Sequence, residues 1–336
     1  MQKNIFYYPY DSGVNKYAER VRSILSGFST VMPLNIKEEL YFFLTFKKKR
    51  GGVAIVNWIE NMIITPKRRK ISLLGVLKLI VSLLVLKYRF DKVIYIQHNL
   101  YPHDTFESHI KIAKWIIEKI SLLVDVVVVH SPLFQDKIYI PHPLYEYPLK
   151  EINIKSDLIV HKDSYLIFGR IEKYKKIEEI IISFPPSKKL IIAGFCNDKK
   201  YEKELNEILS NKENITFIPR YLTDEEASLL FMSCKALIIG HADQDMIVSG
   251  SFFYSLTQQL PVLAIKTPFL EWVQSESKSD ILLTFNNIIS MMEFIESQKS
   301  GFDKKIGFDK NTIDELNSEF GDDYICLLYT SDAADE

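Results

Sequence analysis

Short apolar runs that predict buried strands alternate with helical segments along the sequence, and this alternation restricts the fold more than any other feature. The expected strands are residues 4–8, 54–58, 93–97, 122–130 and 138–141, then 165–168, 189–193, 215–218, 236–239 and 261–265. The expected helices are residues 17–25, 71–86 and 110–120, then 177–183, 201–209, 224–233 and 249–259. Such alternation is typical of parallel sheets covered by helices on both faces, so we predict an α/β fold.

The chain is long enough for two domains. Its 336 residues exceed one ordinary hydrophobic core, and Pro141, Pro143 and Pro148 interrupt regular structure midway. We expect a first domain at residues 1–148 and a second at 149–324, with a crevice between them. Residues 325–336 match no earlier pattern and are a suspected non-native tail. Neither half carries a GxGxxG or a GxxxxGK[ST] motif, which argues against NAD binding and against a P-loop ATPase.

The composition is that of a soluble globular protein, with 47% hydrophobic and 25% charged residues. The net charge of -1 argues against nucleic acid as a partner. Cys196, Cys234 and Cys326 lack the spacing of a disulfide framework or metal site, which indicates a reducing, cytoplasmic compartment. The first residues, MQKNIFYYPY, lack the apolar core of a signal peptide.

The stretch from 165 to 182, YLIFGRIEKYKKIEEIII, combines a strand, a glycine turn and a helix. Gly169 ends the strand, and Arg170, Lys173, Lys175 and Lys176 precede the helix. Free backbone N–H groups, a positive helix end and fixed cations together suit a diphosphate. The alternative is an ordinary turn with solvated lysines.

A second anion site is predicted where Ser249 and Gly250 open a helix, after a loop that holds Asp243 and Asp245. Small residues at a helix start allow backbone N–H contacts with a phosphate, and Ser249 adds a hydroxyl. The same pair also suits an ordinary helix cap. A glycine turn at Gly13, after the first strand, would likewise let a ligand approach the backbone closely.

A polar loop with His98, His103 and Asp104 follows the strand at 93–97. Parallel α/β sheets bind ligands at this end of their strands, and these side chains can transfer protons near neutral pH. A purely structural role is the alternative, and a metal site is less expected. Trp58 and Glu60 close the preceding strand and should face the same edge, whereas His130 and His142 are interpreted as structural.

Two basic clusters, residues 47–50 and 67–70, precede an apolar segment that is too short and too interrupted by Lys78 to span a bilayer. The sequence ISLLGVLKLIVSLLVLKYR predicts either a helix on an anionic membrane or a helix covering the sheet. Nucleic acid is a weaker interpretation, because no aromatic residues alternate with the basic ones.

The sequence, with these motifs in this order, resembles the GT-B glycosyltransferases, in particular the family 4-like and glucuronosyltransferase-like enzymes of bacterial exopolysaccharide, capsule and lipopolysaccharide synthesis. The matching stretches are Asn15-Lys16-Tyr17, IVNWIEN (55–61), QHNLYPHD (97–104), IPHPLYEY (140–147), FGRIEKYKKIEEII (168–181) and SGSFFYSLTQQLPVLA (249–264). The resemblance implies two Rossmann-like domains that face each other across a cleft, with the acceptor on the first and a nucleotide-sugar donor on the second.

The resemblance also implies roles for particular residues. Arg170 and Lys175 would hold the diphosphate, which Ser249 and Gly250 would meet from a helix start. The remaining residues expected at the substrates are Gly13, Trp58, Gly169, Arg220, Asp245 and Tyr254, and His98, His103, Asp104 or Glu60 would be catalytic. Such enzymes generally need no metal, because cations and helix ends offset the charge of the leaving diphosphate.

One departure from the family pattern concerns two glutamates eight positions apart, whose places are occupied here by Met246 and Tyr254. Asp243 or Asp245 are the candidates to replace them, and a retaining outcome is in doubt. The prediction is transfer of a sugar to a lipid-linked or polysaccharide acceptor at the inner face of the cytoplasmic membrane. The alternatives are a nucleotide-sugar epimerase on the same fold and a non-catalytic, membrane-associated assembly protein.

Overall fold

A computed structural model describes residues 4–11, 16–65, 70–102, 105–145, 163–241, 245, 247–276 and 281–298. These residues group into two compact units. The N-terminal unit contains residues 4–143 together with 245, 247 and 248, and the C-terminal unit contains residues 144–241 and 249–298. The predicted border at 148/149 and the tail at 325–336 lie outside the described residues.

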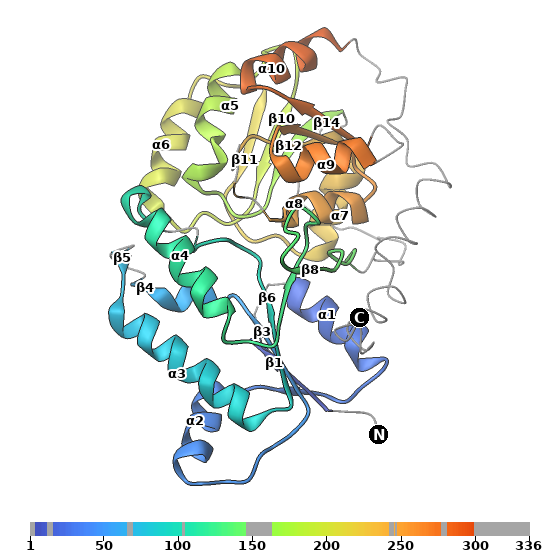
Figure 1. The fold of residues 1–336 in the computed structure, drawn as a ribbon. Coiled ribbons are helices and arrows are strands. Elements are labelled where there is room, and N and C mark those ends of the chain that lie inside the picture. The colour runs from blue at the N-terminus through green and yellow to red at the C-terminus, as the bar shows by residue number, and fades with distance from the viewer. Residues whose placement is uncertain are drawn as a thin grey trace. The chain divides into compact units, whose positions relative to one another are not determined.

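The N-terminal unit is built on a six-stranded parallel sheet with the order β2-β1-β3-β6-β7-β8 (Figure 1). The strands are β1 (Ile5–Tyr8), β2 (Val31–Pro33), β3 (Val53–Asn57), β6 (Lys92–Ile96), β7 (Val126–Val129) and β8 (Ile138–Tyr139), and a small antiparallel pair is formed by β4 (Ile64–Thr65) and β5 (Lys70–Ile71). The helices are α1 (Lys16–Ser26), α2 (Ile36–Leu44), α3 (Leu73–Arg89) and α4 (Ile110–Ser121). Short 3₁₀ turns occupy Ile59–Ile63 and Glu107–His109.

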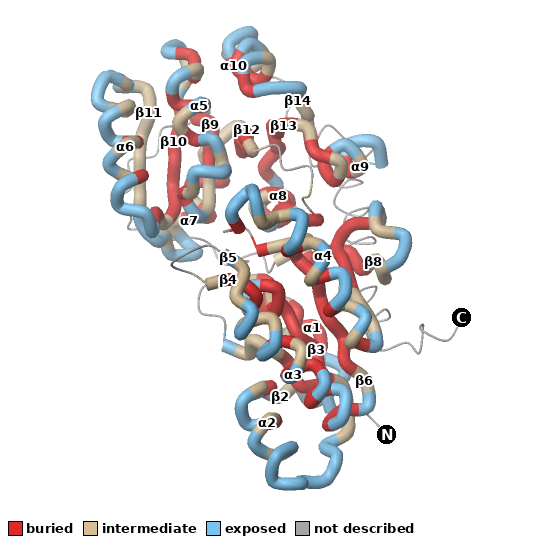
Figure 2. The backbone as a smooth tube through the Cα atoms, turned by 60° about the vertical axis from the view of Figure 1, so that its left-hand side comes forward, coloured by how far each residue is buried: buried red, intermediate tan, exposed pale blue. Residues whose placement is uncertain are grey.

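Alternating side chains of these strands fill two hydrophobic layers, as the twofold period of a strand requires. Phe6, Val56 and Tyr95 point into the layer beneath α3 and α4, to which Leu83 and Ile117 also belong. Helix α1 covers the opposite face of the sheet (Figure 1). Figure 2 shows the resulting pattern, in which the central strands β1, β3 and β6 are largely buried and the loop after α2 is exposed.

The C-terminal unit repeats this architecture with a second six-stranded parallel sheet of order β11-β10-β9-β12-β13-β14. Its strands are β9 (Ser164–Phe168), β10 (Leu190–Ala193), β11 (Ile215–Ile218), β12 (Cys234–Ile239), β13 (Val262–Ile265) and β14 (Leu282–Phe285). Its helices are α5 (Ile177–Ser183), α6 (Lys199–Leu209), α7 (Asp224–Ser233), α8 (Gly250–Thr257), α9 (Pro268–Glu276) and α10 (Ile288–Ser297). Helices α5, α6 and α10 pack on one face through a single core cluster, and α7, α8 and α9 lie on the other (Figure 1).

The predicted α/β class is confirmed, and most predicted elements agree with the structure to within a few residues. The apolar run at 122–130 is one exception, because α4 extends to Ser121 and only Val126–Val129 forms a strand. Helices α2, α9 and α10 and strands β2, β4, β5 and β14 were not predicted. Within the described residues, no helix combines the length and the apolar character needed to cross a bilayer.

Candidate functional site

Each sheet has one place where the strand order reverses. In the C-terminal unit β9 lies between β10 and β12, and in the N-terminal unit β1 lies between β2 and β3. The carboxyl ends of the strands at such a place form the usual ligand-binding edge of an α/β sheet. Gly169 follows β9 directly, and Trp58 follows β3. The topology therefore puts two of the predicted site residues at these edges.

The glycine turn after β9 is closely packed against the end of β10. Gly169 and Gly194 have φ angles of 101° and 143°, in a region that residues with side chains rarely adopt. A Cβ atom on Gly194 would lie only 2.0 Å from the carbonyl oxygen of Gly169. Gly194 is needed because its backbone touches that of Gly169, and Gly169 is favoured by its positive φ angle, while the Lys175 and Ser251 side chains lie beside the turn.

Lys175 is the one cation of this turn that has neither an ion pair nor a hydrogen bond within the described part of the chain. Arg170 pairs with Glu172 at 2.7 Å, Lys173 with Glu204 at 2.9 Å, and Lys176 with Glu179 at 3.8 Å. Lys175 is half-buried instead, and burial lowers its pKa to about 8. A Cβ atom on Gly169 would lie 3.4 Å from its Nζ and 3.5 Å from the Ser251 Oγ.

The start of α8 supplies the second part of this site. The Ser249 hydroxyl caps the helix by accepting a hydrogen bond from the Phe252 N–H at 3.3 Å. The N–H groups of Gly250 and Ser251 have no acceptor among the described residues. An unpaired ammonium, a hydroxyl and a helix start thus converge beside Gly169, and this combination attracts an anion.

The predicted helix end beside Gly169 is arranged differently from the expectation. A 3₁₀ turn at Lys173–Lys175 follows the glycine, and Lys176 adopts a left-handed conformation before α5 begins. The helix start that the contacts place beside the glycine is that of α8, because the Ser251 hydroxyl lies next to Gly169 and Phe168.

Three other residues predicted at the donor have structural partners. Arg220 makes two hydrogen bonds with the Glu226 carboxylate, which hold the pKa of Glu226 at about 2. Asp245 lies 2.6 Å from the Lys114 ammonium. Tyr254 stacks on Phe168, with ring centroids 5.3 Å apart, and burial raises its pKa to about 12.

In the N-terminal unit, His98 lies at the end of β6 with its ring orientation fixed by β3. Its Nε2 is 3.0 Å from the Asn57 Oδ1, while the Asn57 amide nitrogen donates to the Tyr8 carbonyl. His98 Nε2 is therefore the donor, and Nδ1 keeps its lone pair, for which the described residues offer no partner. Trp58 stacks on the imidazole, with the ring centroids 4.4 Å apart.

His98 belongs to a group of three buried histidines around Tyr17. His130 Nδ1 donates to the Ile140 carbonyl at 2.7 Å, so its Nε2 accepts from the Tyr17 hydroxyl, also at 2.7 Å. His142 packs on Tyr17 with ring centroids 4.9 Å apart. Burial lowers the pKa of all three imidazoles, that of His130 to about 4, so they are neutral at pH 7.

Of these three histidines, the sequence analysis placed only His98 at the site and interpreted His130 and His142 as structural residues. The signal that could have grouped them is their position, because each of the three closely follows a parallel strand of the same sheet. Among the described residues, no group of three or more His, Cys, Asp or Glu side chains is arranged to hold a metal ion.

Glu60 is completely buried behind this group. Its carboxylate accepts hydrogen bonds from the Tyr95 hydroxyl at 2.8 Å and from the Asn99 amide at 3.1 Å. Burial raises its pKa to about 7. In this position Glu60 orients Asn99, the residue after His98, and has no exposed oxygen to offer a substrate. Gly13, His103 and Asp104, and the proposed replacement Asp243, lie outside the described residues.

No protein-family model and no curated protein sequence matches this chain. Solved structures do. HepE of Anabaena in complex with UDP-glucose has a TM-score of 0.65 and 11% identity over 98% of both chains. Sucrose-phosphate synthase from Thermosynechococcus elongatus has a TM-score of 0.67 and 11% identity over 98% of this chain and 97% of its own.

A further similar structure is AviGT4, a glycosyltransferase involved in avilamycin A biosynthesis, with a TM-score of 0.55 and 12% identity over 98% of this chain and 96% of its own. The chain has the GT-B fold. The predicted class of two Rossmann-like domains is thereby confirmed. At these identities the likeness concerns the GT-B fold alone.

Proposed function

We propose that the protein is a glycosyltransferase that moves a sugar from a nucleoside-diphosphate sugar to a lipid-linked or polysaccharide acceptor in cell-surface glycan synthesis. Lys175 carries this proposal, as a half-buried cation without a partner in the described part of the chain, placed over the turn between Gly169 and the start of α8. HepE, which shares the fold, was solved with UDP and with UDP-glucose.

The donor diphosphate would lie on the C-terminal unit. There Lys175 and the N–H groups of Gly250 and Ser251 would bind its oxygens, and the anion would raise the depressed pKa of Lys175. Arg170 has a mostly exposed side chain paired with Glu172, and it would turn from this carboxylate to the diphosphate. Charge compensation by these groups supports transfer without a metal ion, which stays a proposal.

The acceptor would lie on the N-terminal unit, where His98 is our candidate base. The acceptor oxygen would attack the anomeric carbon, the bond from that carbon to the diphosphate oxygen would break, and the nucleoside diphosphate would leave. The hydroxyl proton would pass to His98 Nδ1, whose lone pair is free because Asn57 holds the proton on Nε2. His103 and Asp104 stay candidates from the sequence.

Calorimetric titration with UDP and GDP tests the donor site. Lys175→Gln should weaken binding by roughly 1.5–3 kcal/mol, the range for hydrogen bonds to charged groups, and Arg170→Gln should act in the same direction. Lys176→Gln is the matched control, because Lys176 is adjacent, exposed and already paired with Glu179.

Wild-type nucleotide affinity in Lys175→Gln would refute the proposed donor site. Turnover of a sugar donor without any acceptor would instead favour the epimerase. A peripheral position on the anionic inner face of the cytoplasmic membrane completes the proposal, since a lipid-linked acceptor would lie there.

A further inference from the structure

The N-terminal unit exposes a continuous apolar surface on α2, α3 and the loop that follows α2. On α3 the exposed residues recur at helical spacing along the whole length of the helix, about 25 Å for its 17 residues. They are Leu73, Leu74, Leu77, Val81, Leu84 and Tyr88. The opposite side of the helix, with Leu79, Leu83 and Leu86, is buried. Helix α3 thus covers the sheet with one face and shows a second apolar face outward.

The exposed stripe continues onto α2. The Tyr88 ring contacts Phe43 of α2 edge to face, with centroids 5.2 Å apart. Tyr41, Leu44 and Phe46 extend the surface, and Phe46 is 95% exposed. A soluble protein rarely exposes so many neighbouring apolar side chains without a partner for them.

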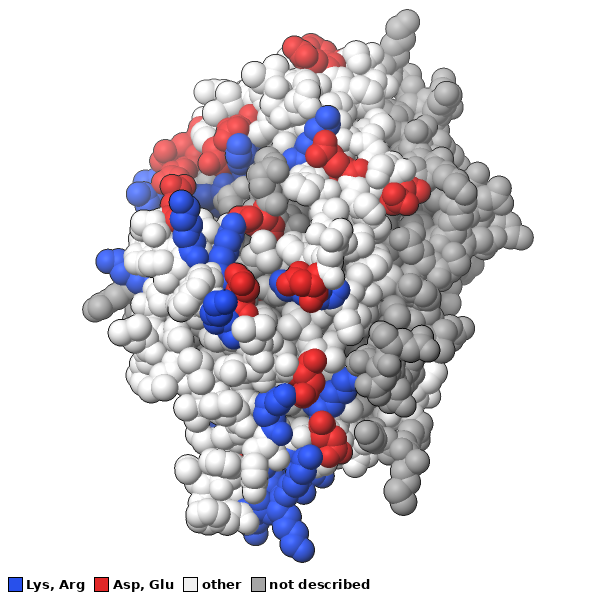
Figure 3. Space-filling model, in the orientation of Figure 1, with Lys and Arg blue, Asp and Glu red and all other residues white. Residues whose placement is uncertain are grey.

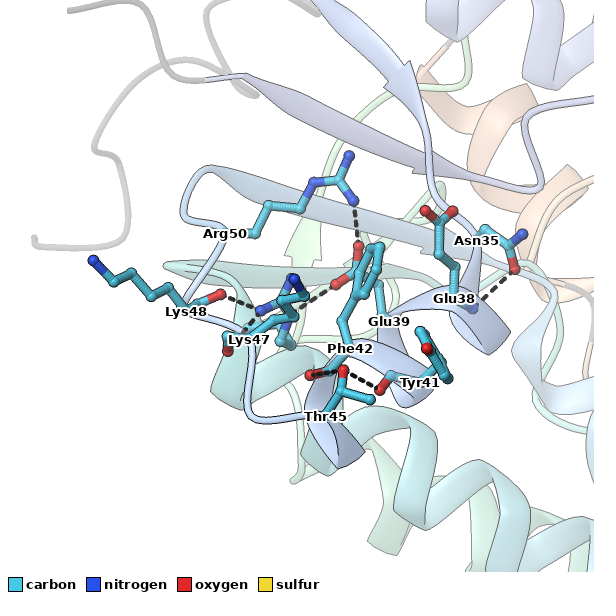
Figure 4. Close-up of polar contacts among 10 residues, drawn as sticks. Asn35, Glu38, Glu39, Tyr41, Phe42, Thr45, Lys47, Lys48 and Arg50 are labelled. Carbon is cyan, nitrogen blue, oxygen red and sulfur yellow. Dashed lines mark hydrogen bonds and ion pairs between the residues drawn. The ribbon is translucent and has the colours of Figure 1, made fainter.

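Buried ionic contacts hold the Phe46 loop in place (Figure 4). Glu39 is fully buried, and its carboxylate pairs with Arg89 at 2.8 Å and with Arg50 at 2.5 Å. The Arg89 guanidinium also donates to the backbone carbonyls of Lys47 and Lys48. Replacing one member of such a buried network is costly, so the loop is kept in one conformation. These buried contacts therefore keep Phe46 exposed.

Basic residues border this surface. Lys47 and Lys48 follow Phe46 directly, and no carboxylate in the described residues pairs with their ammonium groups. Figure 4 shows the Lys48 side chain extending away from the Glu39 contacts, and Figure 3 shows several Lys and Arg side chains gathered at the lower end of the N-terminal unit, beside the place of α2. Lys78 borders the stripe of α3. The two carboxylates of α2 are the buried Glu39 and Glu38, which lies in the first turn, at the opposite end from Phe46.

We infer that this surface, named here the α2–α3 face, docks on an anionic lipid bilayer. Phe46 and the leucines of α3 would enter the boundary between headgroups and acyl chains, and the lysines would contact the lipid phosphates. Compared with the sequence-based membrane interpretation, which concerned the segment 67–86, the structure adds α2 and the Phe46 loop. The inference rests on the proposed function in one respect: a lipid-linked acceptor would require the enzyme to reach the membrane.

Vesicle flotation tests this inference on the full chain, with phosphatidylcholine vesicles and with vesicles that also contain phosphatidylglycerol. The double variant Phe46→Ser with Leu77→Ser should lose about tenfold or more of its vesicle affinity. Its matched control is Met232→Ser with Ile289→Ser, which removes residues exposed by 67% and 66% in the C-terminal unit and should bind like the wild type.

The charge variant Lys47→Gln with Lys48→Gln should lose about fivefold in vesicle affinity per lysine. This loss should occur only with vesicles that contain phosphatidylglycerol, and it should be smaller at high salt. Lys200→Gln with Lys203→Gln, on the exposed side of α6, is its control. Equal flotation of all variants would overturn the inference. A second outcome would also overturn the inference: the wild type fails to bind vesicles and sediments as a dimer, and the variant Phe46→Ser with Leu77→Ser sediments as a monomer. A second copy of the chain would then cover the α2–α3 face.

Nucleotide titration of the same proteins separates the two proposals. Retained UDP or GDP binding without vesicle binding overturns docking alone. Vesicle binding without nucleotide binding overturns the donor site alone.

Discussion

The substitution Glu60→Gln isolates the titration of one buried carboxyl. The pKa of Glu60 is 4.5 as a free group and about 7 in the fold, because burial disfavours its charged form. The folded state therefore binds more protons between these values. Glu60 contributes stability that is full below its unfolded pKa and disappears as the pH rises through 7. Integrated from about pH 5 to pH 8, this loss amounts to about 2.5 kcal/mol.

The glutamine variant should lack this pH dependence. Its amide oxygen can still accept from Asn99, and its amide nitrogen can donate to the Tyr95 hydroxyl, so both existing contacts keep a partner. The buried histidines titrate in the same range with the opposite sign, because their lowered pKa values cost stability as the pH falls below about 6.5. They are common to both proteins and cancel in the difference.

The measurement is urea unfolding of wild type and Glu60→Gln across this pH range, followed by tryptophan fluorescence. A Trp272→Phe background confines the emission to Trp58 and Trp115 of the N-terminal unit. The variant should gain about 2.5 kcal/mol relative to the wild type between pH 5 and pH 8. Parallel stability profiles of the two proteins would refute the reasoning, since Glu60 would then titrate alike in the folded and unfolded states.

Two further predictions concern catalysis and the glycine turn. His98→Gln should lower sugar transfer by a factor on the order of 10²–10⁴ while nucleotide binding stays unchanged in titration, with His109→Gln as control; full turnover would exclude His98 as the base. Gly194→Ala should destabilise the C-terminal unit by about 3 kcal/mol or more in urea unfolding, because its Cβ would collide with the Gly169 carbonyl. Gly250→Ala, whose Cβ would meet only the Tyr145 hydroxyl at 3.8 Å, should be tolerated, and equal stability of both variants would contradict the steric argument.

Local periodicity was enough to predict most elements of the two sheets. Helices α5 and α7 and strand β11 have the predicted bounds. Helix α2 was missed because its pattern is inverted: its buried residue is Glu39, and two of its aromatic residues, Tyr41 and Phe43, are exposed. A periodicity rule expects apolar residues on the buried face, so it does not recognise a helix that directs a carboxylate inward and Tyr41 and Phe43 outward.

The sequence named the candidate site residues, but it did not show which of their side chains have partners in the fold. Four cations follow Gly169 within seven residues of the sequence. Only the fold brings Glu204 of α6 to Lys173 and leaves Lys175 without an ion pair among the described residues. Likewise, Glu60 followed a strand as a catalytic residue would, yet the packing of Tyr95 buries it.

The sequence by itself determined two parallel α/β units and the glycine turn that faces the ligand edge of the second one, because strand and helix periods and φ preferences are local properties. Tertiary structure decided which charges are neutralised, which histidines meet around Tyr17, and that the aromatic side of α2 faces outward. Burial and pairing depend on residues far apart in the chain, and no local pattern contains that information.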